Sequence, residues 1–544
     1  MPVVTFDYND FISLFGHKIS KDELLNRLPM IGADFDKVED DEISIEFFPD
    51  RPDLASVEGI ARASRAFFNI DTGLIKYDTK KSDITITVDP SIKKVRPFVV
   101  TALVRNVTMT DELIASLMEL QEKLHGGIGR NRNKVAIGVH NFEPVEPPFT
   151  YKAVDPDSVE FVPLNKVESM TLNEILERHE KGVDYAHLLK DFDKHPLIVD
   201  KNNNVLSYPP IINGSLTEVT PFTTDLFIDV TGTDRKAVNY VINIVATSLA
   251  ERGGQIYTTK VIDGKKTYMT PDLSPIKRKL SVDYVNKILG TKLTGKEVSF
   301  CLKKMGYNAA VDKLKVNVEI PSWRADILHD IDLVEDVAIG YGFDKFETEL
   351  PTELTFGKTL PSFNLYRALR NIMIGLGFNE VTTFTISNEQ DEFIKLGTIP
   401  ADRVTIENPI GEDYTCLRVG LIPSLLKILN ENRHHPLPQQ IFELGIVVNS
   451  KYKNQYNLAF VKIDAKANFT ECKSLVDSIM RDSGTKFKIE NNDHPGFVKG
   501  RCATIIVRDK KVGIFGELHP KTILGFQLEY PIVAFEIKAD VLYQ

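Results

Sequence analysis

Hydrophobic residues recur along this chain with two different periods, which predict helices and strands mixed throughout its length. A leucine stripe marks one face of a predicted helix over residues 111–124, and it consists of Leu113, Leu117, Leu120 and Leu124. Thr110 precedes this stripe and is placed to cap the helix. Runs rich in β-branched residues, such as 98–107 (FVVTALVRNV) and 226–232 (LFIDVTG), favour strands. We therefore expect an α+β fold.

The second half of the chain contains a compact unit and then a larger mixed region. Two short helices are predicted at 282–290 (VDYVNKILG) and 296–306 (KEVSFCLKKMG), each closed by a glycine. A strand at 313–321 (KLKVNVEIP) and an acidic helix follow, which suggests a helix-turn-helix-like or winged module. From residue 355 onward, helices and several β-runs predict an α+β domain on a largely antiparallel sheet.

A chain of 544 residues is too long for one hydrophobic core, so we expect several domains. The pattern places an N-terminal α/β domain at 1–85, a central α/β domain at 86–268, the helix-turn-helix-like module at 269–350 and a C-terminal domain at 351–544. No segment approaches 18 consecutive apolar residues, which argues against a membrane span. The N-terminus also lacks the pattern of a secretory signal.

The four widely spaced cysteines and the net charge of −10 argue against metal-ribbon, disulfide-rich and simple nucleic-acid-binding proteins. The cysteines form no CxxC pair, which argues against a zinc ribbon or a disulfide framework and favours a reducing, cytoplasmic setting. Nucleic-acid-binding proteins are normally basic, and this chain is acidic. Any contact with RNA is therefore expected to be local, or a partner chain supplies much of the positive charge.

The segment RADILHDIDLVEDVAIGYGF at 324–343 carries the clearest chemistry. Asp332, Glu335 and Asp336 are spaced i, i+3 and i+4, which places three carboxylates on one side of a helix start. Asp326 can fold back onto the same end. Carboxylates this close repel one another unless a cation relieves them, and Mg²⁺ prefers oxygen ligands. The alternative is a solvated acidic first turn, favoured by the helix dipole, without a metal.

Four blocks of sequence follow one another in a specific order. They are FFPDRPDLASVEGIARA (47–63), RNRNKVAIGVHNF (130–142), the acidic segment 324–343, and LRVGLIPSLLKILNENRHHPLPQQIFELG (417–445). Together they resemble the phenylalanyl-tRNA synthetase β-subunit family in its archaeal and eukaryotic form, and the resemblance covers essentially the whole chain. It implies a Mg²⁺ site shared with an α subunit, and its ligands here would be Asp326, Asp332, Glu335 and Asp336.

The resemblance also implies that aminoacylation is carried out by an α subunit, while this chain has a supporting function. A class II synthetase active site needs arginines to hold ATP phosphates, and this chain has no arginine after Arg508. We therefore expect no residues for aminoacylation here, and a class II synthetase core at 351–544 without its catalytic motifs. The α subunit would carry out the ATP-dependent attachment of phenylalanine to tRNA(Phe) in an α₂β₂ heterotetramer. This chain would support that complex and bind tRNA(Phe).

The family's central domain also carries a proofreading site, which implies hydrolysis of Tyr-tRNA(Phe) by residues 86–268. A second site has a physical motive, because a hydrophobic pocket rejects an added hydroxyl by only about 10²-fold. Matching the family motif gives four editing residues: Leu206, Ser215, Asp229 and Thr231. Asp229 would accept the tyrosyl hydroxyl, while Ser215 and Thr231 would orient substrate or water. The alternative is that DVTGTD ends a strand, with Thr231 or Thr233 capping the next helix.

Two other classes of function stay open on the sequence. One is a free-standing RNA-binding or scaffold protein made of synthetase domains, and the other is a stand-alone hydrolase of mischarged tRNA. The loop HGGIGRNRN after the first long helix is interpreted as a helix end followed by a basic surface loop. Its Arg130, Arg132 and Lys134 could touch RNA phosphate. Co-purification with an α subunit would separate the β-subunit function from both alternatives.

Overall fold

The protein is described by a computed structural model that covers residues 3–350 and 355–542. The chain forms two compact units, Met1–Glu349 and Leu350–Gln544. Both units combine helices and strands, so the α+β, multidomain fold expected from the sequence is confirmed. The finer domain boundaries stay predictions. Across the described residues, no helix is both long and apolar enough to cross a membrane.

The N-terminal unit begins with a small antiparallel sheet of strand order β1-β3-β2 and three helices. Its elements are β1 (Val3–Asp7), α1 (Tyr8–Phe15), α2 (Lys21–Arg27), β2 (Ala33–Glu39), β3 (Glu42–Phe47) and α3 (Val57–Phe67). Each helix starts after a polar residue whose side chain accepts hydrogen bonds from first-turn amides, namely Asp7, Ser20 and Ser56.

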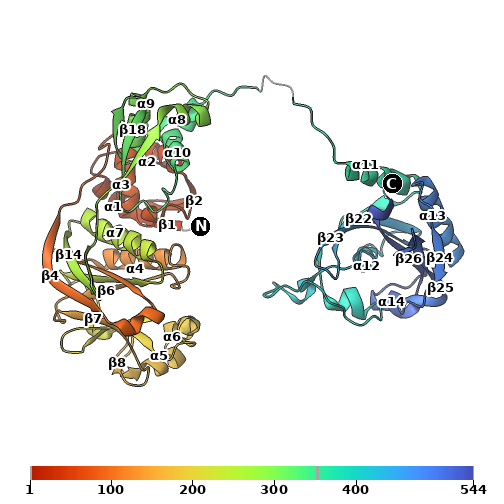
Figure 1. Ribbon diagram of the computed structural model, residues 1–544, viewed down its shortest axis with the longest axis horizontal. Coiled ribbons are helices and arrows are strands. Elements are labelled where there is room, and N and C mark those ends of the chain that lie inside the picture. The colour runs from red at the N-terminus through yellow and green to blue at the C-terminus, as the bar shows by residue number, and fades with distance from the viewer. Residues whose placement is uncertain (1–2, 351–354, 543–544) are drawn as a thin grey trace. The chain divides into compact units, whose positions relative to one another are not determined.

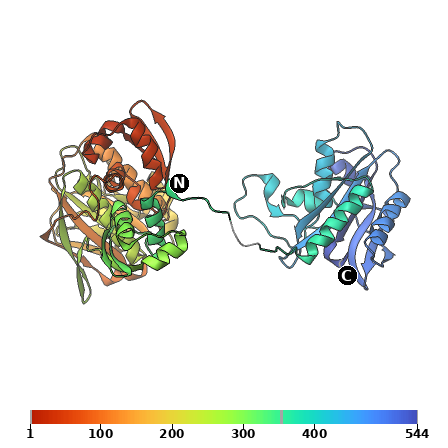
Figure 2. The same ribbon diagram turned by 90° about the horizontal axis from the view of Figure 1, so that it is seen from above.

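A module near the end of this unit shares its hydrophobic core with those first elements. Its elements are β16 (Ile276–Ser281), α8 (Val282–Leu289), α9 (Gly295–Lys304), β17 (Asn308–Asp312), β18 (Lys315–Ile320) and α10 (Asp330–Tyr341). Phe15 of α1 and Ile60 of α3 belong to the same buried cluster as Leu302 of α9 and Leu333 of α10. Figures 1 and 2 show these N-terminal elements in red beside the module in green.

The residues between these two parts form a ten-stranded sheet and its helices. The elements are β4 (Thr79–Val88), β5 (Phe98–Arg105), α4 (Asp111–Gly126), β6 (Val135–Asn141), β7 (Phe149–Val154), β8 (Glu160–Phe161), β9 (Met170–Thr171), α5 (Leu172–Arg178), α6 (Glu180–Tyr185), β10 (His195–Val199), β11 (Val205–Tyr208), β12 (Ile212–Asn213), β13 (Leu226–Gly232), α7 (Arg235–Glu251), β14 (Gln255–Asp263) and β15 (Lys266–Thr270). The strand order is β12-β11-β10-β7-β4-β14-β5-β13-β6, with β15 paired to β14 and β8 paired to β9 in a separate hairpin.

Helices α4 and α7 pack on one face of this sheet, and the other face carries a second hydrophobic core together with a group of polar residues. Thr110 caps α4, as the sequence predicted. On β13, Ile228 and Val230 belong to the core that contains these helices. Asp229 and Thr231 point to the opposite face and line a cavity, because successive side chains of a strand alternate.

The C-terminal unit is a seven-stranded sheet between two layers of helices, and every strand pairs antiparallel except β19 with β22. Its strands are β19 (Asn379–Glu380), β22 (Gln439–Val448), β23 (Asn454–Ile463), β24 (Lys488–Asn491), β25 (Phe497–Val507), β26 (Lys510–Leu518) and β27 (Ile532–Lys538). Helices α11 (Pro361–Gly375) and α13 (Phe469–Asp482) share one core with the sheet, and α12 (Ile422–Glu431) and α14 (Pro520–Gly525) share another.

Two carboxyl groups are buried in this unit beside the start of α12: Glu536, which accepts from the amides of Leu421 and Ile422, and Glu392. Glu392 Oε2 accepts hydrogen bonds from the backbone amides of Val419 at 3.0 Å and Gly420 at 3.2 Å. Its Oε1 has no hydrogen-bond partner among the described residues. Burial raises the pKa of Glu392 from 4.5 to about 7. The ionised form is therefore costly in the folded chain.

Glu392→Gln is expected to make the pH dependence of stability in the C-terminal unit shallower. The folded pKa lies above the unfolded one, so this carboxyl lowers the unfolding free energy as pH rises from about 4.5 to about 7. The loss is on the order of 3 kcal/mol and is complete above that window. Hydrogen exchange of α12, converted to opening free energies at pH 5 and pH 8, measures it. The control is Glu431→Gln, because Glu431 is exposed. The same change in opening free energy between pH 5 and pH 8 in the parent, Glu392→Gln and Glu431→Gln would contradict the prediction.

Candidate functional site

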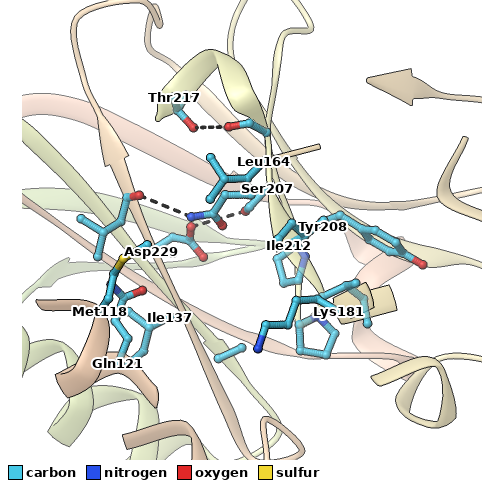
Figure 3. A pocket seen from close by; sticks show the side chains of 18 of the residues that line it. Met118, Gln121, Ile137, Leu164, Lys181, Ser207, Tyr208, Ile212, Thr217 and Asp229 are labelled. Atoms are coloured by element: carbon cyan, nitrogen blue, oxygen red, sulfur yellow. Dashed lines mark hydrogen bonds between the residues drawn. The ribbon is translucent and has the colours of Figure 1, made fainter. Parts of the chain in front are cut away.

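A cavity of about 540 Å³ lies where the two ends of the ten-stranded sheet come together, and this size is typical of ligand pockets. The Nδ2 amide of Asn213 on β12 donates to the carbonyl oxygen of Val139 on β6 at 3.3 Å, so the first and last strands of the order meet. Helix α4 and the start of α6 complete the wall. Figure 3 shows Met118 and Gln121 of α4 on one side and Asp229 among the strands.

The polar wall of the cavity centres on a buried carboxylate. Asp229 is 1% exposed, and its Oδ2 lies 2.7 Å from Nε2 of His140 on β6. The Ser207 hydroxyl on β11 donates to the same oxygen at 3.4 Å. Among the described residues, no group hydrogen-bonds to Oδ1. This second oxygen is therefore available to a ligand.

A glycine makes room for the carboxylate and the imidazole. Gly138 lies directly opposite Asp229 in the antiparallel register of β6 and β13. A Cβ atom at position 138 would lie 2.2 Å from Asp229 Oδ2 and 2.7 Å from His140 Nε2. Any larger residue would therefore push the two side chains apart.

Most of the remaining wall is apolar. The apolar lining residues include Ile114, Leu117, Met118, Ile137, Val139, Leu164, Ile211, Ile212 and Val219, and the carboxyl groups of Glu122, Glu180 and Glu218 also belong to the lining. Such a wall suits an aromatic ring, and one carboxylate oxygen suits a hydroxyl donor on that ring. Lys181 also lines the cavity (Figure 3), and its ammonium group has no partner among the described residues. Its charge suits an anionic part of a ligand.

The basic loop after α4 contributes to the cavity instead of lying wholly on the surface. Arg130, Asn131 and Arg132 have φ angles of 48°, 51° and 65°, a left-handed turn that is uncommon outside glycine. This turn buries Arg132, whose guanidinium donates to the Ile211 carbonyl at 2.8 Å and to Glu122 at 2.5 Å. The prediction of a basic surface loop is therefore wrong for Arg132, which supports the cavity wall.

A second buried guanidinium lies against Thr231. Arg96 donates from Nε to the Thr231 hydroxyl at 3.0 Å and from a terminal nitrogen to the Thr231 carbonyl at 2.9 Å. Burial lowers the pKa of Arg96 to about 10, while Tyr151 and Asp229 act in the opposite direction. Arg96 therefore stays cationic at neutral pH and holds Thr231 in the wall.

The acidic segment before and within α10 is arranged around a buried arginine. Arg324 donates from Nε and a terminal nitrogen to the two oxygens of Asp326, at 2.8 and 2.6 Å. The same terminal nitrogen donates to Asp336 Oδ2 at 2.7 Å, and the Tyr307 hydroxyl donates to that oxygen as well. Burial raises the pKa of Asp336, and Arg324 opposes that shift.

The other two acids of the segment lie in different surroundings. Asp332 Oδ2 accepts from the backbone amides of Leu328 at 2.7 Å and His329 at 2.6 Å, and it closes the first turn of α10. Glu335 is exposed, whereas Asp336 is buried. Consecutive residues point about 100° apart around a helix. The three acids lie within that arc, so they share one side of the helix start as predicted, and burial together with the charges of Asp336 and Asp332 raises the pKa of Glu335.

Two family models and many full-length relatives match this chain. The B5 domain of tRNA synthetases matches residues 278–343, and the CLM domain of the phenylalanyl-tRNA synthetase β chain matches residues 347–539. The phenylalanine–tRNA ligase β subunit of Methanosarcina acetivorans is 48% identical over 545 residues, covering 100% of this chain and 99% of the relative. The Archaeoglobus fulgidus β subunit is 45% identical, with coverage of 100% and 99%. This chain belongs to the phenylalanine–tRNA ligase β-subunit family.

A solved structure supports the same family for the N-terminal unit. An N-terminal fragment of the phenylalanyl-tRNA synthetase β subunit from Pyrococcus horikoshii is 38% identical and superimposes with a TM-score of 0.61. The match covers 62% of this chain and 99% of that fragment. The family predicted from the four sequence blocks is thus confirmed, and as a β subunit this chain is part of a tRNA ligase.

The structure brings together two of the four residues that the β-subunit motif assigned to proofreading. Asp229 and Thr231 both line the cavity. Leu206 is fully buried in a hydrophobic cluster of the sheet, and Ser215 begins a short 3₁₀ turn, and neither is a lining residue. The segment DVTGTD does end a strand and cap the next helix, but the cap of α7 is Asp234 and neither Thr231 nor Thr233.

Leu206 and Ser215 do not line the cavity, but a residue close to each of them in the sequence does. Ser207 follows Leu206 in β11 and faces the cavity because adjacent strand residues point to opposite faces. Thr217 lies at the other end of the turn that Ser215 begins (Figure 3). Strict alternation along β11 is a signal that could have selected Ser207. His140 lies behind the wall, and its neighbourhood in sequence gives no sign of its contact with Asp229.

The four acids do not fit a Mg²⁺ site made by this β subunit alone. The described residues contain no group of three or more His, Cys, Asp or Glu side chains placed to hold a metal ion. Asp326 and Asp336 are paired with Arg324, and backbone amides occupy Asp332. Arg324 and the backbone amides therefore relieve part of the repulsion among the acids, while the charges of the neighbouring acids, after burial, still raise the pKa of Glu335.

Proposed function

We propose that the central cavity of this β subunit proofreads for the ligase by hydrolysing Tyr-tRNA(Phe) while sparing Phe-tRNA(Phe). One observation carries the proposal: the buried Asp229 presents a free Oδ1 oxygen in an otherwise largely apolar cavity. A tyrosyl hydroxyl donates to this oxygen, whereas a phenylalanyl ring leaves the carboxylate unpaired. Sites that hydrogen-bond a substrate hydroxyl reject the analogue without it by roughly 10⁴–10⁵-fold.

The rest of the lining supports the same substrate. The apolar wall accepts the aromatic ring, and the ammonium group of Lys181 complements the phosphate charge at the tRNA end. Water attacks the ester carbonyl, the bond to the terminal ribose breaks, and tyrosine and tRNA(Phe) are released. A purified ligase complex that deacylates Tyr-tRNA(Phe) and Phe-tRNA(Phe) at equal rates would contradict the proposal.

We also propose that an α subunit performs the synthetic reaction within an α₂β₂ heterotetramer. The absence of arginine after Arg508 supports this division, because ATP phosphates need guanidinium partners in a class II site. Co-expression of this chain with an α subunit, followed by phenylalanine-dependent ATP–pyrophosphate exchange, tests it. We expect exchange by the complex and by neither chain alone. Exchange by this chain alone would overturn the assignment.

The Mg²⁺ site shared with an α subunit stays a prediction. It requires that Arg324 release the two carboxylates with which it is paired. Asp326 and Asp336 become available as ligands only when the α subunit draws Arg324 away from them. Titration with Mn²⁺, followed by electron paramagnetic resonance, is expected to show no stoichiometric site on this chain alone. A site on the complex that disappears in Asp326→Asn/Asp336→Asn would support the prediction. Unchanged binding in that variant would remove these residues from it.

A further inference from the structure

We propose that His140 is a positioning residue of the proofreading site, an inference that rests on the function proposed above. Its imidazole holds Oδ2 of Asp229, so that Oδ1 stays directed at the cavity. His140 itself is not a lining residue and has no exposed surface. It therefore acts on a substrate only through the residues that it holds.

Both ring nitrogens of His140 contact residues of the cavity wall. Nε2 lies 2.7 Å from Asp229 Oδ2, and Nδ1 lies 2.8 Å from the Thr217 hydroxyl. A carboxylate only accepts, so Nε2 carries the proton that is donated to Asp229. In the neutral ring, Nδ1 then accepts from the Thr217 hydroxyl at 2.8 Å, and the other acceptor within reach of that hydroxyl, the Gly214 carbonyl, is more distant at 3.3 Å. The Asp229 carboxylate thus selects the tautomer protonated at Nε2, and the Thr217 hydroxyl supports it by donating to Nδ1.

The surroundings of His140 fix the ring as firmly as its hydrogen bonds do. His140 lies opposite Phe227 in the register of β6 and β13, and the two ring centroids are 6.3 Å apart. Gly138 leaves the gap in which the imidazole meets the carboxylate. Asp229 has two other polar neighbours, the weakly bonded Ser207 and the cation Arg96. Without His140, the carboxylate can rotate toward either of them.

If His140 had only a structural role, variants that mimic either ring nitrogen would have similar effects on activity. Two near-isosteric variants therefore test the proposal. In His140→Gln the side-chain amide reaches the position of Nε2 and still donates to Asp229. In His140→Asn the shorter amide reaches only the position of Nδ1, next to Thr217. The two variants are similar in size and polarity, and they differ in the contact that matters.

The test measures deacylation of Tyr-tRNA(Phe) and Phe-tRNA(Phe) by the full chain, in complex with an α subunit. We expect His140→Asn to lower kcat/KM for Tyr-tRNA(Phe) at least tenfold, and His140→Gln to stay within threefold of the parent. The ratio of kcat/KM for Tyr-tRNA(Phe) to kcat/KM for Phe-tRNA(Phe) should fall in His140→Asn and change little in His140→Gln. Equal losses in both variants, or equal losses for both substrates, would overturn the positioning role. Fluorescence melting of Trp323, the only tryptophan, which is packed in the core behind this sheet, checks the fold.

Gly138→Ala provides an independent variant, because its Cβ would separate the carboxylate of Asp229 from the imidazole of His140 without altering either side chain chemically. We expect it to lower the Tyr-to-Phe ratio as His140→Asn does, and an unchanged ratio would contradict the geometry.

A direct readout separates this inference from the proposed function. Nitrogen-15 NMR of labelled histidines is expected to show His140 protonated at Nε2, with that preference weakened in Thr217→Val. This result would stand even if the parent chain failed to deacylate Tyr-tRNA(Phe), a failure that would end the proofreading proposal. Protonation at Nδ1 alone would overturn the inference whatever the activity.

Discussion

Arg324→Met is expected to lower the unfolding free energy of the N-terminal unit by about 3–5 kcal/mol, the usual cost of breaking a buried ion pair from one side. The Arg324 side chain is 2% exposed and is the cation that Asp326 and Asp336 share. Methionine fills a similar volume but removes the guanidinium that hydrogen-bonds both carboxylates, which leaves Arg51 as the nearby positive charge. Asp336 is affected most, since it is buried and keeps only the Tyr307 hydroxyl.

Denaturant unfolding followed by Trp323 fluorescence measures this effect, because Trp323 adjoins Arg324 and is buried in the same unit. Arg278→Met is the matched control: Arg278 forms a more exposed pair with Asp330 and should cost at most about 1 kcal/mol. Adding Asp326→Asn and Asp336→Asn to Arg324→Met should recover most of the loss. A loss below about 1 kcal/mol for Arg324→Met would show that the acids are stabilised by something other than this arginine.

Asp229→Asn is expected to slow deacylation of Tyr-tRNA(Phe) by about 10²-fold while leaving aminoacylation by the complex unchanged. Asparagine keeps the size of the side chain but removes its charge, and a hydrogen bond to a charged group contributes about 1.5–3 kcal/mol. The amide can also turn its NH₂ group toward the substrate hydroxyl, which then loses its acceptor. Rates for Phe-tRNA(Phe) should change little, since phenylalanine makes no such bond.

Single-turnover assays with both charged tRNAs measure this prediction. Asp225→Asn is the control, because Asp225 precedes the same strand but forms a partly exposed pair with Arg105 at 3.4 Å. It removes an equal charge close to the cavity without touching the lining. An unchanged rate for Tyr-tRNA(Phe) in Asp229→Asn would remove Asp229 as the hydroxyl acceptor.

Local patterns predicted the elements well because their causes are local. The leucine stripe and Thr110 cap of α4 follow from the helical repeat and from the unpaired amides of a first turn, and Gly290 ends α8 in a left-handed conformation. The cavity depends on something different. It forms because β12 comes round to meet β6, and the period of a strand does not specify its neighbours in a sheet.

The candidate site shows the same division between local and non-local causes. The motif located Asp229 and Thr231, but it gave Leu206 where its neighbour Ser207 faces the cavity, since a shift of one residue reverses the face of a strand. His140 could not be selected because its partner lies on another strand. Charge spacing placed Asp336 on the correct side of α10 but could not predict its burial, because helical periodicity fixes direction around the axis while burial depends on what packs there.

The core shared by α1, α3, α9 and α10 has a consequence for synthesis on the ribosome. The first helices pack on each other and on β1–β3, but their apolar faces are fully covered only when residues about 240–290 positions later have been made. At about 5–20 residues per second, those faces wait roughly 10–60 s, while the central sheet can already assemble between them. The earliest segment of the nascent chain is therefore among the last to be buried, and it is the stretch on which a chaperone would be expected to act.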